Sequence, residues 1–216
     1  MKSSNGMMGS LDCMHTQWKN CPKAWQALYK SGKESGGPTV VLEAMSDYDF
    51  WFWHASFGYA GSLNDLNILN LSPFLECLVD GSFKTLEEAA GIVPFYVGDE
   101  NFNALFALVD GIYPRYSQIV KGISMPVTAE EIAFSAWQES SRKDIERAFG
   151  MLQCRFQVMT RPFTPCRLTK ISTTVSSVSS CIIRASPTES WREMYIQCMI
   201  RVRTSLMMDF ARTCRR

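Results

Sequence analysis

Two apolar, strand-like runs of this chain carry an aspartate near their ends. MMGSLDCM contains Asp12, and FALVD ends at Asp110. A third acid, Glu146, lies much later, on the amphipathic stretch SSRKDIERAFGMLQCRF. Strands and a helix that each contribute one acid indicate an α/β fold in which segments distant in sequence come together.

Three such acids suggest a particular chemistry. Carboxylates gathered on adjacent strand ends repel one another unless divalent cations lie between them, and hard oxygen ligands suit Mg²⁺ or Mn²⁺. Two ions roughly 3.5–4 Å apart can activate a water and stabilise the leaving oxygen of a phosphoryl displacement. The spacing alone leaves open a more common arrangement, in which the acids are unrelated surface or capping carboxylates.

The sequence around the acids resembles a known family. Four ordered blocks carry the resemblance: GSLDCMHTQWKNCPKAW, PTVVLEAMSDYDFWFWHASFGYAGSLNDLNILNLSPF, LVDGIYPRY and QESSRKDIERAFGMLQCRF. They resemble the DDE endonuclease core of Harbinger-type transposases and, more closely, the plant-transposon-protein branch. The resemblance runs from about Gly6 to about Phe163.

This resemblance implies a fold and a site. The expected fold is α/β and RNase H-like, a mixed five-stranded sheet flanked by helices on both faces, with the strands ending at Asp12 and Asp110 as neighbours. Asp12, Asp110 and Glu146 match the catalytic acids of the family and would be the ligands of Mg²⁺ or Mn²⁺. Water would first attack a DNA phosphodiester, and the freed 3′-hydroxyl would then attack target DNA.

Other function classes stay open. The chain could be an inactive remnant, or a domesticated module that binds DNA or protein, because relatives work with a separate Myb-like DNA-binding protein. A more remote alternative is an unrelated α/β protein with a binding role. The expected partners are DNA and the Myb-like protein, and self-association into a homo-oligomer stays open.

Composition and charge narrow these classes. At 216 residues and 46% hydrophobic, the chain can bury one substantial core. No apolar run reaches about 18 residues, which argues against membrane and secretory proteins and leaves the nucleus or cytoplasm. The eight cysteines lack a C-x-x-C pair and zinc-like spacing and are interpreted as reduced thiols. The net charge is −11 over residues 43–139 and +5 over residues 140–170, so a DNA-binding surface would have to come mainly from outside the central block.

The hydrophobic pattern predicts where the elements lie. Strands are expected over residues 7–14, over TVVLEAMSD after Pro38, over residues 49–59, and over residues 94–97 and 104–110 on either side of a GDEN hairpin turn. Polar residues 18–37 predict a long hairpin or mobile loop. A helix capped by Ser62 or Asn64 is expected to be divided at Pro73.

The helix that carries Glu146 is expected to begin at Ser141, which forms an approximate capping box with Asp144. Its buried stripe would consist of Ile145, Phe149, Leu152 and Phe156. Glu146 lies just off this stripe. On helix geometry alone, an exposed Glu146 paired with Arg142 across one turn is an alternative to a catalytic role.

Four further positions carry weaker signals. His15 lies on the opposite strand face from Asp12, and His54 lies among strand aromatics, so neither is expected to bind metal or act as a base. Asp65 is expected to cap a helix, with substrate positioning as the alternative. The segment around Lys19 could contact a DNA backbone or anchor the loop.

Residues 1–165 are therefore predicted to form the endonuclease core, and residues 166–216 a degenerate or frameshifted segment that is poorly ordered. Of the closing helix expected for the family, only Cys181, Ile182 and Ile183 remain, and residues 172–180 are crowded with Ser and Thr. The chain begins eleven residues before Asp12 and so is expected to lack the family's usual DNA-binding region. These departures suggest a truncated copy.

Overall fold

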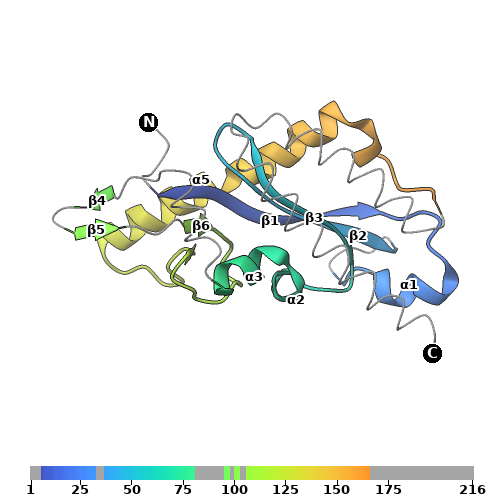
Figure 1. Ribbon diagram of the computed structural model, residues 1–216, viewed down its shortest axis with the longest axis horizontal. Helices are drawn as coiled ribbons and strands as arrows, with labels where there is room; N and C mark the ends of the chain where they lie inside the picture. The colour runs from blue at the N-terminus through green and yellow to red at the C-terminus, as the bar shows by residue number, and fades with distance from the viewer. Residues whose placement is uncertain (1–5, 33–36, 81–94, 98–99, 103–105, 166–216) are drawn as a thin grey trace.

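A mixed five-stranded sheet forms the centre of the protein (Figure 1). The computed structural model describes residues 6–32, 37–80, 95–97, 100–102 and 106–165. The strands, in spatial order, are β3 (Phe52–Ala60), β2 (Thr39–Ser46), β1 (Met7–Gln17), β6 (Phe106–Leu108) and β7 (Ile119–Val120). β2 is antiparallel to β1 and β3, whereas β6 is parallel to β1 and β7. The predicted α/β, RNase H-like arrangement is confirmed, and the strands associated with Asp12 and Asp110 are neighbours.

β2 is the most deeply buried strand. All eight of its residues are buried, because helices cover the sheet on both faces. The turn into β3 is closed by Asp47, whose carboxylate accepts hydrogen bonds from the backbone amides of Asp49 and Trp51 and from the Trp53 indole. The β-branched TVVLEAMS run and the aromatic run after it therefore form adjacent strands, as predicted.

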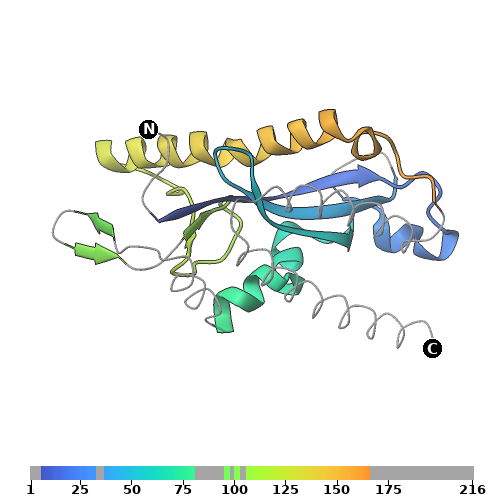
Figure 2. The same cartoon turned by 45° about the horizontal axis from the view of Figure 1, so that its top comes forward.

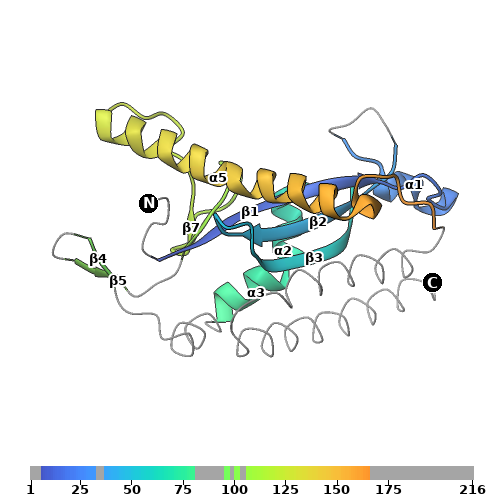
Figure 3. The same cartoon turned by 90° about the horizontal axis from the view of Figure 1, so that it is seen from above.

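The long helix α5 (Ala129–Arg155) covers one face of the sheet and crosses it lengthwise (Figure 2, Figure 3). The predicted stripe is correct: Ile145, Phe149 and Leu152 are buried and pack with β2, and Phe156 is partly buried beside them. The predicted start at Ser141 is wrong. The helix begins after Thr128, which forms a full capping box with Glu131. A Ser-x-x-Asp pattern inside a helix resembles a capping box in sequence. Only the helical backbone on both sides of Ser141 shows that no helix begins there.

Two short helices cover the other face of the sheet (Figure 2). These are α2 (Asp65–Leu71) and α3 (Pro73–Asp80). Asn64 caps α2 by accepting a hydrogen bond from the Asn67 amide, so the predicted cap and the division at Pro73 are both confirmed. The prediction that Asp65 is the cap is wrong. Asp65 is the first residue of α2, and it is buried.

Two other local predictions are wrong. β4 (Phe95–Val97) pairs with β5 (Glu100–Phe102) in a separate two-stranded sheet, and not with the segment that contains β6. β6 instead joins the main sheet beside β1, a partner about 100 residues away that no local pattern indicates. Within residues 18–37, Lys23–Tyr29 forms helix α1 in place of the expected loop.

The residues just after β1 are hydrogen-bonded to the chain that follows α5. Trp18 is buried, and its indole nitrogen donates a 2.7 Å hydrogen bond to the Pro165 carbonyl. Asn20 donates to the Thr164 carbonyl. These contacts anchor the segment, which was one of the two predicted roles. No described helix is both long and apolar enough to cross a membrane. The prediction for residues 166–216 lies outside the described residues.

Candidate functional site

Asp12 lies where the parallel part of the sheet stops. β1 was predicted to end beside Asp12, but it runs on to Gln17. Its partner β6 pairs with it only as far as Ser10, which lies opposite Leu108. Continuing that register by two residues on each strand brings Asp12 beside Asp110. Asp12 therefore lies on β1, and Asp110 lies two residues after the end of the neighbouring strand β6.

Asp12 points to the face covered by α5, as Ser10 and Met14 do. Its Oδ1 accepts a 2.8 Å hydrogen bond from the Cys13 amide, and its Oδ2 lies 3.7 Å from Nη1 of Arg142. Burial raises the pKa of the Asp12 carboxyl above its ordinary value. The Cys13 amide and Arg142 counteract this, and the charges of Asp65 and Glu146 add to it. The site is therefore one in which a charged Asp12 is costly.

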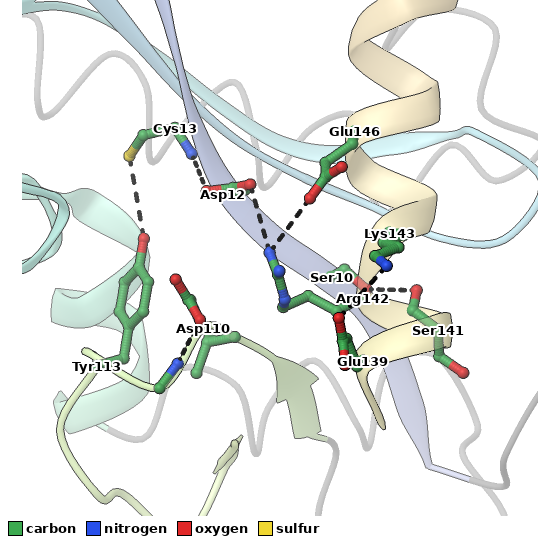
Figure 4. Close-up of polar contacts among 12 residues, drawn as sticks. Ser10, Asp12, Cys13, Asp110, Tyr113, Glu139, Ser141, Arg142, Lys143 and Glu146 are labelled. Carbon is green, nitrogen blue, oxygen red and sulfur yellow. Dashed lines mark hydrogen bonds and ion pairs between the residues drawn. The ribbon is translucent and has the colours of Figure 1, made fainter. Parts of the chain in front are cut away.

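Glu146 reaches the same place from α5 (Figure 4). Its Oε1 lies 3.5 Å from the same Arg142 nitrogen that contacts Asp12. The two carboxylate oxygens therefore lie within about 7 Å of each other, because both contacts share one nitrogen. The pairing of Glu146 with Arg142 that helix spacing suggested is present, and Glu146 is half exposed. Because Arg142 also contacts Asp12, this is more than a surface pair.

Asp110 is exposed just after β6, on the loop drawn beside Asp12 in Figure 4. Its Oδ1 accepts a hydrogen bond from the Gly111 amide, and its carbonyl accepts one from the Tyr113 amide, which closes a tight turn. The buried Gln138 of α5 donates to the carbonyls of Val109 and Val120. The turn that carries Asp110 is therefore tied to α5, the element that carries Glu146.

A second contact fixes α5 against β1. The buried Ser10 hydroxyl donates a 3.2 Å hydrogen bond to the Ser141 carbonyl, one residue before Arg142. Together with the stripe around Ile145, this contact sets how far Arg142 and Glu146 project over Asp12. The Ser10–Ser141 contact therefore joins the strand that carries Asp12 to the helix that carries Glu146, although the two residues are 131 positions apart in sequence.

The three acids suit a hard divalent ion by their chemistry. All are carboxylates, the ligands that Mg²⁺ and Mn²⁺ prefer. Burial raises the pKa of the neighbouring Cys13 thiol far above its ordinary value, so this sulfur is not a thiolate that would favour a softer metal. Within the described part of the chain, no three His, Cys, Asp or Glu side chains lie close enough to hold an ion as they stand. The guanidinium of Arg142 lies between two of the acids instead.

A second polar cluster lies on the opposite face of the sheet, between β2, β3 and the α2–α3 junction. Glu43 is fully buried there, and its Oε2 lies 3.1 Å from Nε2 of His54 and accepts a hydrogen bond from Ser72. His15 lies elsewhere, with its Nδ1 3.1 Å from the Thr39 hydroxyl. The sequence analysis missed Glu43, although a lone acid inside the apolar run TVVLEAMS is the signal that could have revealed it.

The raised pKa of Asp12 predicts how stability depends on pH. The folded state holds the Asp12 proton more tightly than the unfolded chain, whose carboxyl has a pKa near 3.8. The cost of ionising Asp12 in the folded protein is therefore absent below that pH and grows as pH rises through the folded pKa. In metal-free buffer, Asp12→Asn should melt at a higher temperature than the parent at pH 7, and at the same temperature near pH 3. Melting curves across this range test it, and an Asn variant that is less stable at pH 7 would contradict it.

One of the comparisons with known proteins gave a match. A family model described as plant transposon protein matches residues 1–193. Neither the curated proteins nor the solved structures gave a match. The matched region contains all three acids and every described element of the fold.

Proposed function

The chain belongs to the plant transposon protein family, and on that premise we propose that it is a metal-dependent DNA endonuclease of the DDE type, of Harbinger descent. One observation carries the proposal. Asp12 and Glu146, which are far apart in sequence, both contact one Arg142 nitrogen, and Asp110 follows β6, the strand that pairs with β1. Carboxylates carried by β1, by the turn after β6 and by α5 are the kind of ligands that a two-ion phosphodiester site requires.

Each acid has a distinct part in the proposed site. Asp12 would bind the ion from the central strand, where its carboxylate accepts a hydrogen bond from the Cys13 amide. Asp110, exposed on its turn, and Glu146, half exposed on α5, complete the site from the solvent side. Bound divalent ions would supply the chemistry, by activating a water and stabilising the leaving 3′-oxygen. The open side, where Asp110 and Glu146 are exposed, is where a DNA strand could approach.

The proposed partners follow from the proposed nuclease function. DNA is the substrate, and a separate Myb-like DNA-binding protein, in the nucleus or cytoplasm, would supply recognition of transposon ends. Lys143 and Arg147 are about half exposed on α5 on either side of Glu146, so they offer positive charge near the site. Strand transfer to a target and self-association belong to the same proposal.

A nicking assay tests the proposal. The parent protein is incubated with supercoiled plasmid in Mn²⁺ or Mg²⁺, with Ca²⁺ and EDTA as the two controls. We expect nicked circles in Mn²⁺ or Mg²⁺ and none in EDTA, because the carboxylates alone cannot stabilise the negative charge of the transition state. Absence of nicking with both ions, or equal nicking in EDTA, would remove the nuclease function.

The Arg142 contacts favour a second candidate, a non-catalytic module that binds DNA or protein. A guanidinium that pairs with Asp12 and Glu146 can neutralise the acids without any ion. Such a module would cleave no DNA in any metal, and a module that binds DNA would also retard labelled DNA in a gel shift. The same plasmid assay therefore separates the two candidates.

A further inference from the structure

Arg142 has an unusual place for a cation on a helix surface. Its side chain is only 16% exposed, and one nitrogen, Nη1, lies 3.7 Å from Asp12 and 3.5 Å from Glu146. Both distances exceed the roughly 2.7–3.2 Å of a normal N–H···O hydrogen bond. Arg142 therefore does not clamp either carboxylate in a bidentate pair, but lies between them as a shared counterion (Figure 4).

The neighbouring charges on α5 behave differently. Lys143 and Arg147 each pair with an acid one turn away on their own helix, Glu139 and Asp144. Arg142 also contacts an acid of the central strand, Asp12. Among the described residues, Arg142 is the one cation within ion-pair distance of Asp12 or Glu146. Any change in the charge of this site must therefore act on Arg142 first.

We propose that Arg142 is a built-in counterion that takes the place of a divalent ion at these acids and is displaced when the ion binds. This inference rests on the proposed metal site. An ion bound to Asp12 and Glu146 would contact their oxygens at about 2.0–2.1 Å. The guanidinium, held within 4 Å of the same oxygens, would then lie close to a like-charged ion and be repelled. The two cations are alternatives, so Arg142 lowers the affinity for the ion.

Displacement has a second consequence for the site. Glu146 is half exposed, so the released guanidinium can move towards solvent on the side where DNA would approach. A guanidinium fork matches the geometry of a phosphate group. Arg142 would then hold the acids together without metal and become available to phosphate only when the ion is bound.

Mn²⁺ binding to purified protein tests the inference, with free Mn²⁺ measured by electron paramagnetic resonance. We expect Arg142→Gln to bind Mn²⁺ roughly tenfold more tightly than the parent, within the usual range of coupling between two sites. The matched control is Lys143→Gln. It removes one positive charge from the next residue along the helix, whose side chain pairs with Glu139. It should change the affinity less than about threefold, since exposed charges are screened.

Two further variants make the result decisive. Arg142→Met keeps the aliphatic stem and should tighten binding as Gln does, so it gives the answer if the Gln variant fails to fold. Melting curves supply a second readout: Mn²⁺ should raise the melting temperature of both neutral variants more than that of the parent. Unchanged or weaker Mn²⁺ binding by the folded neutral variants would overturn the counterion role and leave the nuclease proposal standing. If Asp12→Asn leaves Mn²⁺ binding unchanged, both in the parent and in the Arg142→Gln variant, both proposals fail.

Discussion

Replacing Asp110 with Asn is expected to lower Mn²⁺-dependent nicking by about 100- to 10,000-fold. Asn keeps the size of the side chain and can still accept the hydrogen bond from the Gly111 amide, so the turn should persist. What it loses is the charge that holds an ion, which contributes several kcal/mol of transition-state stabilisation, and each 1.4 kcal/mol corresponds to a factor of ten in rate. Asp12→Asn and Glu146→Gln should show losses of the same order, because the three acids act as one unit.

The control for this series is Glu139→Gln. Glu139 lies on the same helix as Glu146, but its side chain is 64% exposed and its ion-pair partner is Lys143. Its replacement should leave nicking within about twofold of the parent, as is usual for an exposed charge away from the site. Initial rates on supercoiled plasmid measure the effect, and melting curves show whether each variant is folded. Nicking that survives in all three site variants would mean that other residues, or a contaminating nuclease, perform the cleavage.

Glu43→Ala is expected to cost about 2–5 kcal/mol of folding free energy, because each buried polar group that loses a hydrogen-bond partner costs about 1–3 kcal/mol. Glu43 is fully buried, and its removal takes an acceptor from both His54 and Ser72 beneath α2 and α3. A typical domain has only about 5–15 kcal/mol of net stability, so the variant should be close to unfolding at room temperature. Urea denaturation of the parent and the variant measures the difference.

The matched control for this change is Glu139→Ala, which truncates an exposed glutamate and should cost no more than about 0.5 kcal/mol. A second comparison isolates the pair. In a His54→Ala background, Glu43→Ala should cost clearly less than in the parent, because the partner of Glu43 has already been removed. Equal losses from Glu43→Ala in both backgrounds would show that the two residues do not stabilise each other.

Local sequence patterns determined the elements whose signals are complete within a short window. The β-branched run of β2, the Asn64 cap, the break at Pro73 and the Ile145 stripe were all predicted correctly. In each case the deciding physics is local, since side-chain branching, a cap hydrogen bond or a missing amide acts within a few residues. These elements were enough to predict the α/β class, whereas the helices on both faces of the sheet were implied by the family resemblance.

Local sequence patterns could not decide long-range pairing. The family resemblance implied that β1 and β6 are neighbours, whereas the local pattern placed β6 in a hairpin that does not form, and the two-residue β7 completed the sheet where no strand was expected. Strands this short have almost no periodicity of their own and exist because a neighbour offers backbone partners. The early start of α5 belongs to the same class of error, because a cap-like pattern at Ser141 competed with the true cap at Thr128.

The candidate site, too, was predicted in part from the sequence and decided in part by the tertiary structure. The sequence by itself determined which acids to consider: residue chemistry pointed to carboxylates, and four ordered blocks singled out Asp12, Asp110 and Glu146. Only the tertiary structure decided that Arg142 contacts Asp12 as well as Glu146, and that Glu43 is buried beside His54. A side chain's charge and hydrogen-bonding capacity are properties of its own residue, whereas its partners depend on how the sheet brings distant segments within a few ångströms of each other.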